Sequence, residues 1–204
     1  MNKYLKYFLI GSSIILGLFV IGFIIFNLMI ASAFGAFDKT YSVTELKEEY
    51  FSKEKEIQDV INYYDFIKPK DYTVDIEFTD EKLLSRLTIY KKDSSKVVYQ
   101  KWDVPIGEMQ SQELTTYLEW SGNEVKTLKE KLDKANCISV EDGEPIKIGF
   151  KRSGMGMFSF VIFRNKGKDI QNFNNGCDYI MVNRNIALQY GGGAIGTQCF
   201  PNKN

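Results

Sequence analysis

The sequence contains no histidine, and this absence removes several kinds of catalytic site. Ser-His-Asp and Cys-His catalysis need an imidazole as the base, and His-ligated zinc needs it as a ligand. Cysteine is also scarce: there are three, and none forms a C-x-x-C pair, so a four-cysteine zinc site and a thioredoxin-type redox centre are excluded. The residues therefore predict no catalytic centre of these types, no metal site and no cofactor.

An odd number of cysteines leaves at least one thiol unpaired within the chain. Cys177 and Cys199 both lie in the C-terminal strand region, whereas Cys137 ends an amphipathic helical stretch and is expected to be buried. If the domain is exported, the pairing to expect is a disulfide between Cys177 and Cys199. Spacing alone leaves the other pairings open.

Charged side chains are missing between Tyr7 and Phe37, and most of this segment is Ile, Leu, Phe, Val, Met and Gly. At about 1.5 Å of rise per residue, a helix of this length exceeds the ~30 Å hydrocarbon core of a bilayer. Residues 1–6 are therefore predicted to be a short basic leader, and residues 7–37 a transmembrane helix with its flank. Ala31-Ser32-Ala33 resembles a cleavage site, but the apolar run is longer than the about 7 to 15 residues of a secretory signal.

The distribution of lysine around this run predicts its orientation. Lys3 and Lys6 precede it without an acidic residue, whereas the following flank mixes Lys39 and Lys47 with several acids. Positive charge is retained on the cytoplasmic side, so the pattern favours a cytoplasmic N-terminus and an extracytoplasmic domain. We expect a single-pass signal-anchor protein in the inner membrane of a bacterial cell.

Residues 38–204 are predicted to form one α+β domain, because no repeat or low-complexity linker divides them. A three-to-four spacing of apolar residues predicts a juxtamembrane amphipathic helix over 43–67, and a second helical region is predicted over 111–136. Period-two alternation predicts a β-meander over 72–104 and β-hairpins over 146–200. We expect an antiparallel sheet of about six to eight strands with the helices packed on it.

Two interpretations of the 43–67 helix remain open. Its apolar stripe can pack on the domain's own sheet, which we favour because Lys53 interrupts the stripe, or it can form a short parallel coiled coil through 43–64. Ser13 and Gly17 add a small-xxx-small spacing in the membrane helix. The second interpretation implies a structural envelope protein that self-associates through its membrane and juxtamembrane helices.

Two segments near the C-terminus have unusual composition. The strand predicted over Met157–Phe163 is apolar on both alternating sets, which predicts cover on both of its faces. Gly191–Gly196 matches G-x-G-x-x-G but lacks the following helix that a dinucleotide site requires. We interpret these glycines as a tight turn whose bare backbone would line any recess of the domain.

Charge is divided unevenly along the domain: residues 38–145 hold 16 Lys and Arg against 24 Asp and Glu, and residues 146–204 hold 8 against 2. This division is typical of ordinary solvated surface, or of an anion-binding face on the late strands. The candidate residues for an anion or partner site are Lys147, Lys151, Arg152, Arg164, Lys166 and Arg184. The bilayer, anionic headgroups or an acidic protein surface are the expected partners; nucleic acid is not, because the chain is nearly neutral.

These features predict a membrane-anchored binding or interaction domain without enzymatic activity, whose ligand the residues do not name. The alternative is a membrane-anchored hydrolase or transferase that uses carboxylates. Such chemistry needs two carboxyl groups opposed across a cleft, whereas neighbours such as Asp75 and Glu77 are typical of the solvated face of a strand.

Overall fold

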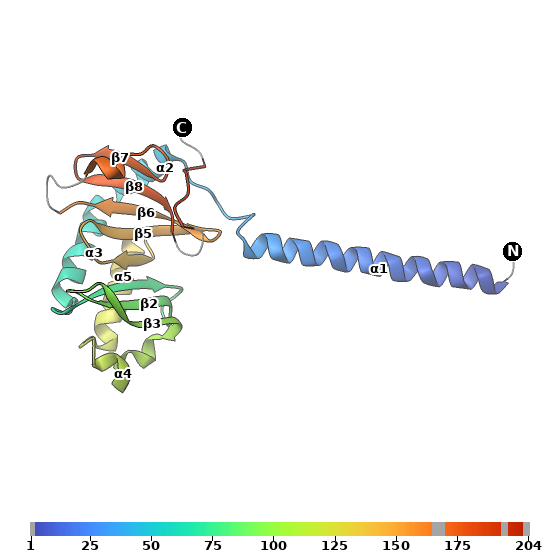
Figure 1. Ribbon diagram of the computed structural model, residues 1–204, viewed down its shortest axis with the longest axis horizontal. Helices are drawn as coiled ribbons and strands as arrows, with labels where there is room; N and C mark the ends of the chain where they lie inside the picture. The colour runs from blue at the N-terminus through green and yellow to red at the C-terminus, as the bar shows by residue number, and fades with distance from the viewer. Residues whose placement is uncertain (1–2, 165–169, 193–195, 202–204) are drawn as a thin grey trace.

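The computed structural model describes residues 3–164, 170–192 and 196–201. Its first element, α1 (Lys3–Ala33), is a 31-residue helix that projects from the domain as a separate rod (Figure 1). The span Lys6–Ser32 is long and apolar enough to cross a membrane, and it is not buried within the protein. The predicted segment 7–37 is therefore helical as far as Ala33 and forms a turn over 34–37, and its apolar span is not buried within the protein.

The domain is built on one eight-stranded antiparallel sheet with the strand order β3-β2-β1-β4-β5-β6-β8-β7. The strands are β1 (Tyr72–Phe78), β2 (Leu83–Lys91), β3 (Lys96–Pro105), β4 (Ser139–Glu141), β5 (Ile146–Ser153), β6 (Gly156–Ile162), β7 (Tyr179–Asn183) and β8 (Ile186–Gly191). The three-residue β4 joins the β1–β3 meander to the late hairpins. The predicted α+β class with an antiparallel sheet is confirmed.

Two helices of the domain precede its first strand, and two lie between β3 and β4. They are α2 (Val43–Ser52), α3 (Glu54–Ile67), α4 (Gln112–Thr115) and α5 (Gly122–Lys134), with the 3-10 turns η1 (Ile106–Gln110) and η2 (Ile170–Phe173). The juxtamembrane helix predicted as one element is broken at Lys53, whose φ of −119° and ψ of 14° leave the helical region. The break falls where the apolar stripe is interrupted, so α2 and α3 pack on the sheet as two separate helices.

The helices α2, α3 and α5 pack on one face of the sheet and form the main core with it. The Tyr64 hydroxyl of α3 donates a hydrogen bond to the Val74 carbonyl of β1 at 2.8 Å, and the ring of Tyr50 in α2 meets Phe160 of β6 edge-on. The apolar stripe of 43–64 is thus buried in the chain's own core. Self-association through this stripe would require it to leave that core.

The opposite face of the sheet carries the alternate side chains and is mainly polar. Its residues include Asp75, Glu77, Arg86, Ser139, Glu141, Lys147, Ser159 and Gln189, as the strand register requires. At the β7 side, a small cluster around Val161 and Phe163 is covered by Phe173 of η2. The chain itself therefore supplies the cover predicted for the second face at Val161 and Phe163, whereas Ser159 of β6 lies on the polar part of that face.

The C-terminal segment is fastened back onto the domain. Cys177 and Cys199 are joined by a disulfide, and Phe200 is buried in the main core. Gly191 forms an isolated bridge with Thr197, within the region 146–200 where β-hairpins were predicted. The remaining cysteine, Cys137, is buried, and this burial raises the pKa of its thiol to about 12.

Candidate functional site

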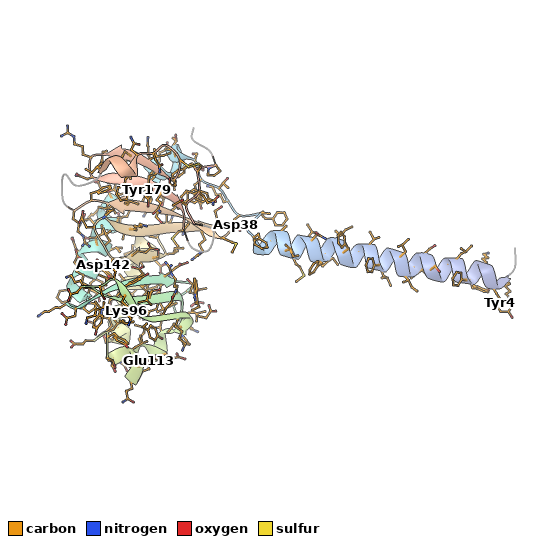
Figure 2. All side chains as sticks on the ribbon, in the orientation of Figure 1. Tyr4, Asp38, Lys96, Glu113, Asp142 and Tyr179 are labelled. Carbon is orange, nitrogen blue, oxygen red and sulfur yellow. A yellow bond between two sulfur atoms is a disulfide. The ribbon has the colours of Figure 1, made fainter. Side chains whose placement is uncertain are left out.

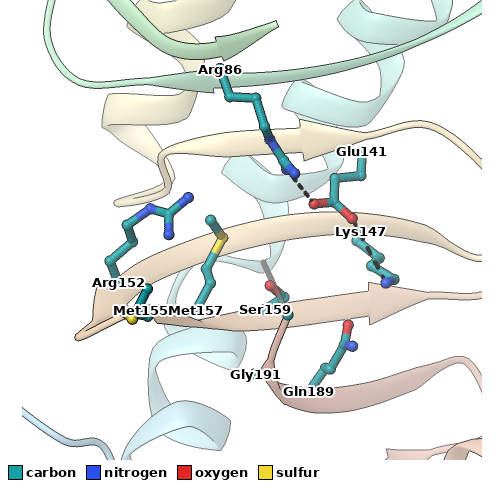
Figure 3. Close-up of a pocket in the computed structure, with 10 residues that line it drawn as sticks. Arg86, Glu141, Lys147, Arg152, Met155, Met157, Ser159, Gln189 and Gly191 are labelled. Atoms are coloured by element: carbon teal, nitrogen blue, oxygen red, sulfur yellow. Dashed lines mark hydrogen bonds and ion pairs between the residues drawn. The ribbon is translucent and has the colours of Figure 1, made fainter. Parts of the chain in front are cut away.

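The polar face of the sheet is hollowed into a small recess of about 40 Å³ (Figure 3). It lies over β2, β4, β5, β6 and β8, and it is lined by Arg86, Glu141, Lys147, Arg152, Met155, Met157, Ser159, Gln189, Gly191 and Gly192. This volume accommodates a few water molecules or one small polar group, and it is far below that of a pocket for a drug-sized ligand. A larger ligand could therefore place only one of its polar groups in the recess.

Two cationic side chains converge on one carboxylate in the recess. The guanidinium Nη2 of Arg86 lies 2.8 Å from Oε1 of Glu141, and Nζ of Lys147 lies 3.7 Å from Oε2 of the same group (Figure 3). The Nε of Arg86 is buried and has no hydrogen-bond partner among the described residues. An unmade hydrogen bond of a buried charged donor is costly, so the position of Arg86 depends on its ion pair with Glu141.

A third cation, Arg152, is held at the edge of the recess by a carboxylate beneath it. Its Nε and Nη2 lie 2.5 and 2.6 Å from the two oxygens of Glu77, a bidentate pair. Glu77 is only 1% exposed, although its alternation with Asp75 predicted a solvated strand face. That expectation is corrected, because Arg152 reaches across from β5 and covers the carboxylate.

The lining is consequently richer in positive than in negative charge. Arg86, Lys147 and Arg152 contribute three cations, and Glu141 is the one carboxylate among the lining residues. Ser159 and Gln189 add neutral polar groups on β6 and β8. The chemistry of this lining suits an anionic group that can accept several hydrogen bonds at once.

Asp75 lies beside the recess on β1, directly opposite Glu141 of β4. Burial raises the pKa of its carboxyl to about 7, and the negative charge of Glu141 adds to this effect. Its Oδ1 accepts a hydrogen bond from the Asp142 backbone N–H at 3.2 Å. A carboxyl with a pKa near neutrality has the property of a general acid or base, but Asp75 does not line the recess.

The basic residues singled out from the sequence are divided among several places. Among the described members of that group, Lys147 and Arg152 alone line the recess. Lys151 lies over the Phe150 ring, Arg164 pairs with Asp65 at 2.9 Å, and Arg184 is exposed between β7 and β8. Lys166 lies outside the described residues.

Sequence reasoning missed Arg86, Glu141, Ser159 and Gln189 as lining residues. Alternation alone could have placed each on the polar face of its strand, but not beside the others, because that requires the strand order. The backbone of the glycine segment was predicted to line any recess of the domain, and Gly191 and Gly192 do line this one. The φ values of these two glycines, 108° and 97°, are ones that other residues rarely adopt.

A second hollow, of about 600 Å³, lies between the end of α3 and the connection from α4 to α5. Its lining mixes aromatic and charged residues and includes Phe66, which is 81% exposed, and Trp120. The Trp120 indole N–H donates to the Ile67 carbonyl at 2.6 Å, which fixes the wall. This groove is large enough for a ligand but has no group of converging charges like that of the recess.

The fold and the recess together define an α+β domain that follows a long apolar helix and carries a recess lined by cations on the polar face of its sheet. Within residues 3–164, 170–192 and 196–201, no three Cys, Asp or Glu side chains are grouped so that they could hold a metal ion. No family model, curated protein or solved structure matches the chain. Inference about function therefore depends on the residues of the recess themselves.

Proposed function

We propose that the protein is a single-pass, membrane-anchored binding domain without enzymatic activity, and that its recess receives an anionic group of a partner. The lining of the recess supports this: Arg86 and Lys147 flank Glu141, and Arg152, paired with Glu77, stands at the edge, so cations outnumber carboxylates. A carboxylate or phosphate group there would pair with the lining cations and offset the positive charge that Glu141 and Glu77 leave unbalanced.

The size of the recess limits how much of a partner can enter it. A hollow of about 40 Å³ takes a single anionic group, so the rest of the partner lies outside it. An acidic side chain of another protein and the headgroup of an anionic lipid share this chemistry. Both are available to a domain held beside a bilayer.

The proposal includes a location: the inner membrane of a bacterial cell, with a cytoplasmic N-terminus and an extracytoplasmic domain. Lys3 and Lys6 on the N-terminal side of α1 support this orientation. The Cys177–Cys199 disulfide supports it independently, because disulfides persist in oxidising compartments.

The best test of the recess is Lys147→Gln in the full-length chain. Lys147 is partly exposed, and Glu141 keeps its closer partner Arg86 at 2.8 Å, so the loss of Lys147 leaves no buried charge unpaired. Arg152 is a poorer choice, because its removal would leave the buried Glu77 without a counter-ion. Lys151→Gln is the matched control: it removes the same charge from the same strand, over Phe150 and away from the recess.

The assay is capture from solubilised membranes with the wild type and the two variants as bait, together with analysis of the phospholipids that co-purify. We expect Lys147→Gln to lose a protein partner or an anionic lipid that Lys151→Gln retains, and the lost species identifies the source of the anion. Equal capture by all three chains would refute the recess as the binding site.

A carboxylate-based hydrolase or transferase is the second candidate, and the pKa of about 7 at Asp75 favours it. A broad activity screen of the full-length chain, with Asp75→Asn beside the exposed control Asp93→Asn, separates the two functions. Turnover that Asp75→Asn abolishes and Asp93→Asn preserves would overturn the non-enzymatic proposal.

A further inference from the structure

The end of α1 is docked on the turn between β5 and β6. After Ala33 the chain passes through Gly35, and a Cβ atom on Gly35 would overlap the backbone of Gly154 in that turn. The Asp38 carboxylate accepts a hydrogen bond from the Gly154 N–H at 2.6 Å. Figure 2 shows Asp38 where the rod of α1 meets the domain. The helix therefore continues into a contact with the sheet and not into a free tether.

Both glycines of this contact are required by its geometry. Their φ values are 73° for Gly35 and 59° for Gly154, in the left-handed region that favours glycine. A Cβ on Gly154 would lie 2.6 Å from the Phe34 carbonyl oxygen. The close approach of the two backbones thus depends on the missing side chains at both positions.

The contact fixes the depth of the β5–β6 turn relative to a membrane. The apolar run of α1 continues past its last turn into Phe34 and Phe37, which are 62% and 69% exposed, and the next residue, Asp38, is charged. The point where the apolar run ends and charge begins marks the boundary between acyl chains and water. Gly154 touches the chain at this boundary, so the turn lies at the same level.

The turn itself has the composition of a segment that meets lipid. Residues 153–157 carry no charge, and Met155 at the tip is an exposed apolar side chain, with 36% of its surface accessible. The charge nearest to it along the chain is Arg152, a cation, whose side chain is partly exposed beside Glu77. An uncharged turn with an apolar tip is suited to the region of phospholipid headgroups.

We propose that the β5–β6 turn, Ser153–Gly156, is a second membrane contact: Met155 enters the headgroup region of the same bilayer that α1 crosses. This inference requires the anchored state of the proposed function and adds a fixed orientation to it. The domain then stands with one end of its sheet on the membrane. The opposite end, which holds the β2–β3 turn, points away from the membrane.

The test places an environment-sensitive fluorophore on Met155→Cys in the full-length chain, reconstituted in phosphatidylcholine vesicles with and without phosphatidylglycerol. The native cysteines do not compete, because Cys137 is buried and the other two form a disulfide. Ser94→Cys, in the exposed turn between β2 and β3, is the matched control at the opposite end of the sheet.

We expect blue-shifted emission, quenched by lipids spin-labelled near the headgroup, at position 155 and neither effect at position 94. Gly35→Ala should reduce both effects at 155, because its Cβ forces the turn away while the domain core is untouched. Emission at 155 like that at 94, or an unchanged signal in Gly35→Ala, would overturn the second contact.

Carbonate extraction of the same vesicles separates the two proposals. A chain that stays in the membrane while position 155 reports water refutes the second contact alone. A chain that carbonate releases refutes the anchor, and with it the contact. Quenching at 155 in both lipid mixtures identifies the bilayer surface as the partner, and quenching only with phosphatidylglycerol adds a requirement for anionic headgroups.

Discussion

Replacing Asp75 with asparagine should make the domain more stable at neutral pH. Burial and the neighbouring charge of Glu141 raise the pKa of Asp75 from 3.8 to about 7. The folded chain therefore holds this proton between about pH 4 and pH 7, where the unfolded chain has released it. By linkage, the contribution of Asp75 to the free energy of unfolding decreases as the pH rises through this window and is constant above it.

The size of this effect follows from the pKa difference. One pKa unit corresponds to about 1.4 kcal/mol, so Asp75 removes about 3 to 4 kcal/mol of stability between pH 4 and pH 7. An asparagine keeps an oxygen that can accept the Asp142 N–H but cannot ionise. We expect wild type and Asp75→Asn to have similar stability near pH 4, and the variant to be more stable by about 2 to 4 kcal/mol near pH 7.5.

The measurement is urea unfolding of the full-length chain in detergent at a series of pH values, followed by the fluorescence of Trp102 and Trp120. The difference between variant and wild type isolates the contribution of Asp75, since the other groups titrate in both. Asp93→Asn, on the exposed turn between β2 and β3, should give a curve parallel to the wild type. Parallel curves for Asp75→Asn as well would refute the reasoning.

Three further predictions concern other contacts of the domain. Arg152→Gln should cost about 2 to 4 kcal/mol in urea unfolding, because it leaves Glu77 buried and unpaired, and adding Glu77→Gln should recover part of the loss; a double variant as unstable as the sum of both would contradict this. Cys177→Ser should lower the free energy of unfolding by about 3 kcal/mol, because it opens the loop that the disulfide to Cys199 closes over a sequence separation of 22. Comparing the melting temperature of the wild type with and without reductant checks this. Ser121→Ala should cost about 1 kcal/mol through loss of the α5 cap; an unchanged melting temperature would show that the cap is not needed.

Periodicity and capping predicted the elements of this fold well, because these signals are local. The sequence has the capping-box pattern at Ser42-Val43-Thr44-Glu45 and at Ser121-Gly122-Asn123-Glu124, and both boxes form with their two reciprocal hydrogen bonds. The alternation over β1 correctly separates Val74 and Ile76, which face the helices, from Asp75 on the other side. A pattern of this kind fixes which face a side chain occupies.

The recess could not be predicted, because β4 brings it together. This strand has only three residues, too few for a periodic signal, and it places Glu141 between Asp75 of β1 and Lys147 of β5. Arg86 then reaches Glu141 across β1. Without the strand order, these side chains cannot be distinguished from the other charged residues of the surface.

The shortness of β4 also has a consequence for how the chain folds. The β1–β3 meander and the hairpins β5–β6 and β7–β8 each pair strands that are close in sequence, which is the fast class of contact. The seam from β1 to β4 pairs residues far apart in the chain, Asp75 with Glu141, and gains only three residue pairs for doing so. We therefore expect two half-sheets to form early and the seam to close last, so that the recess exists only once the whole domain has assembled.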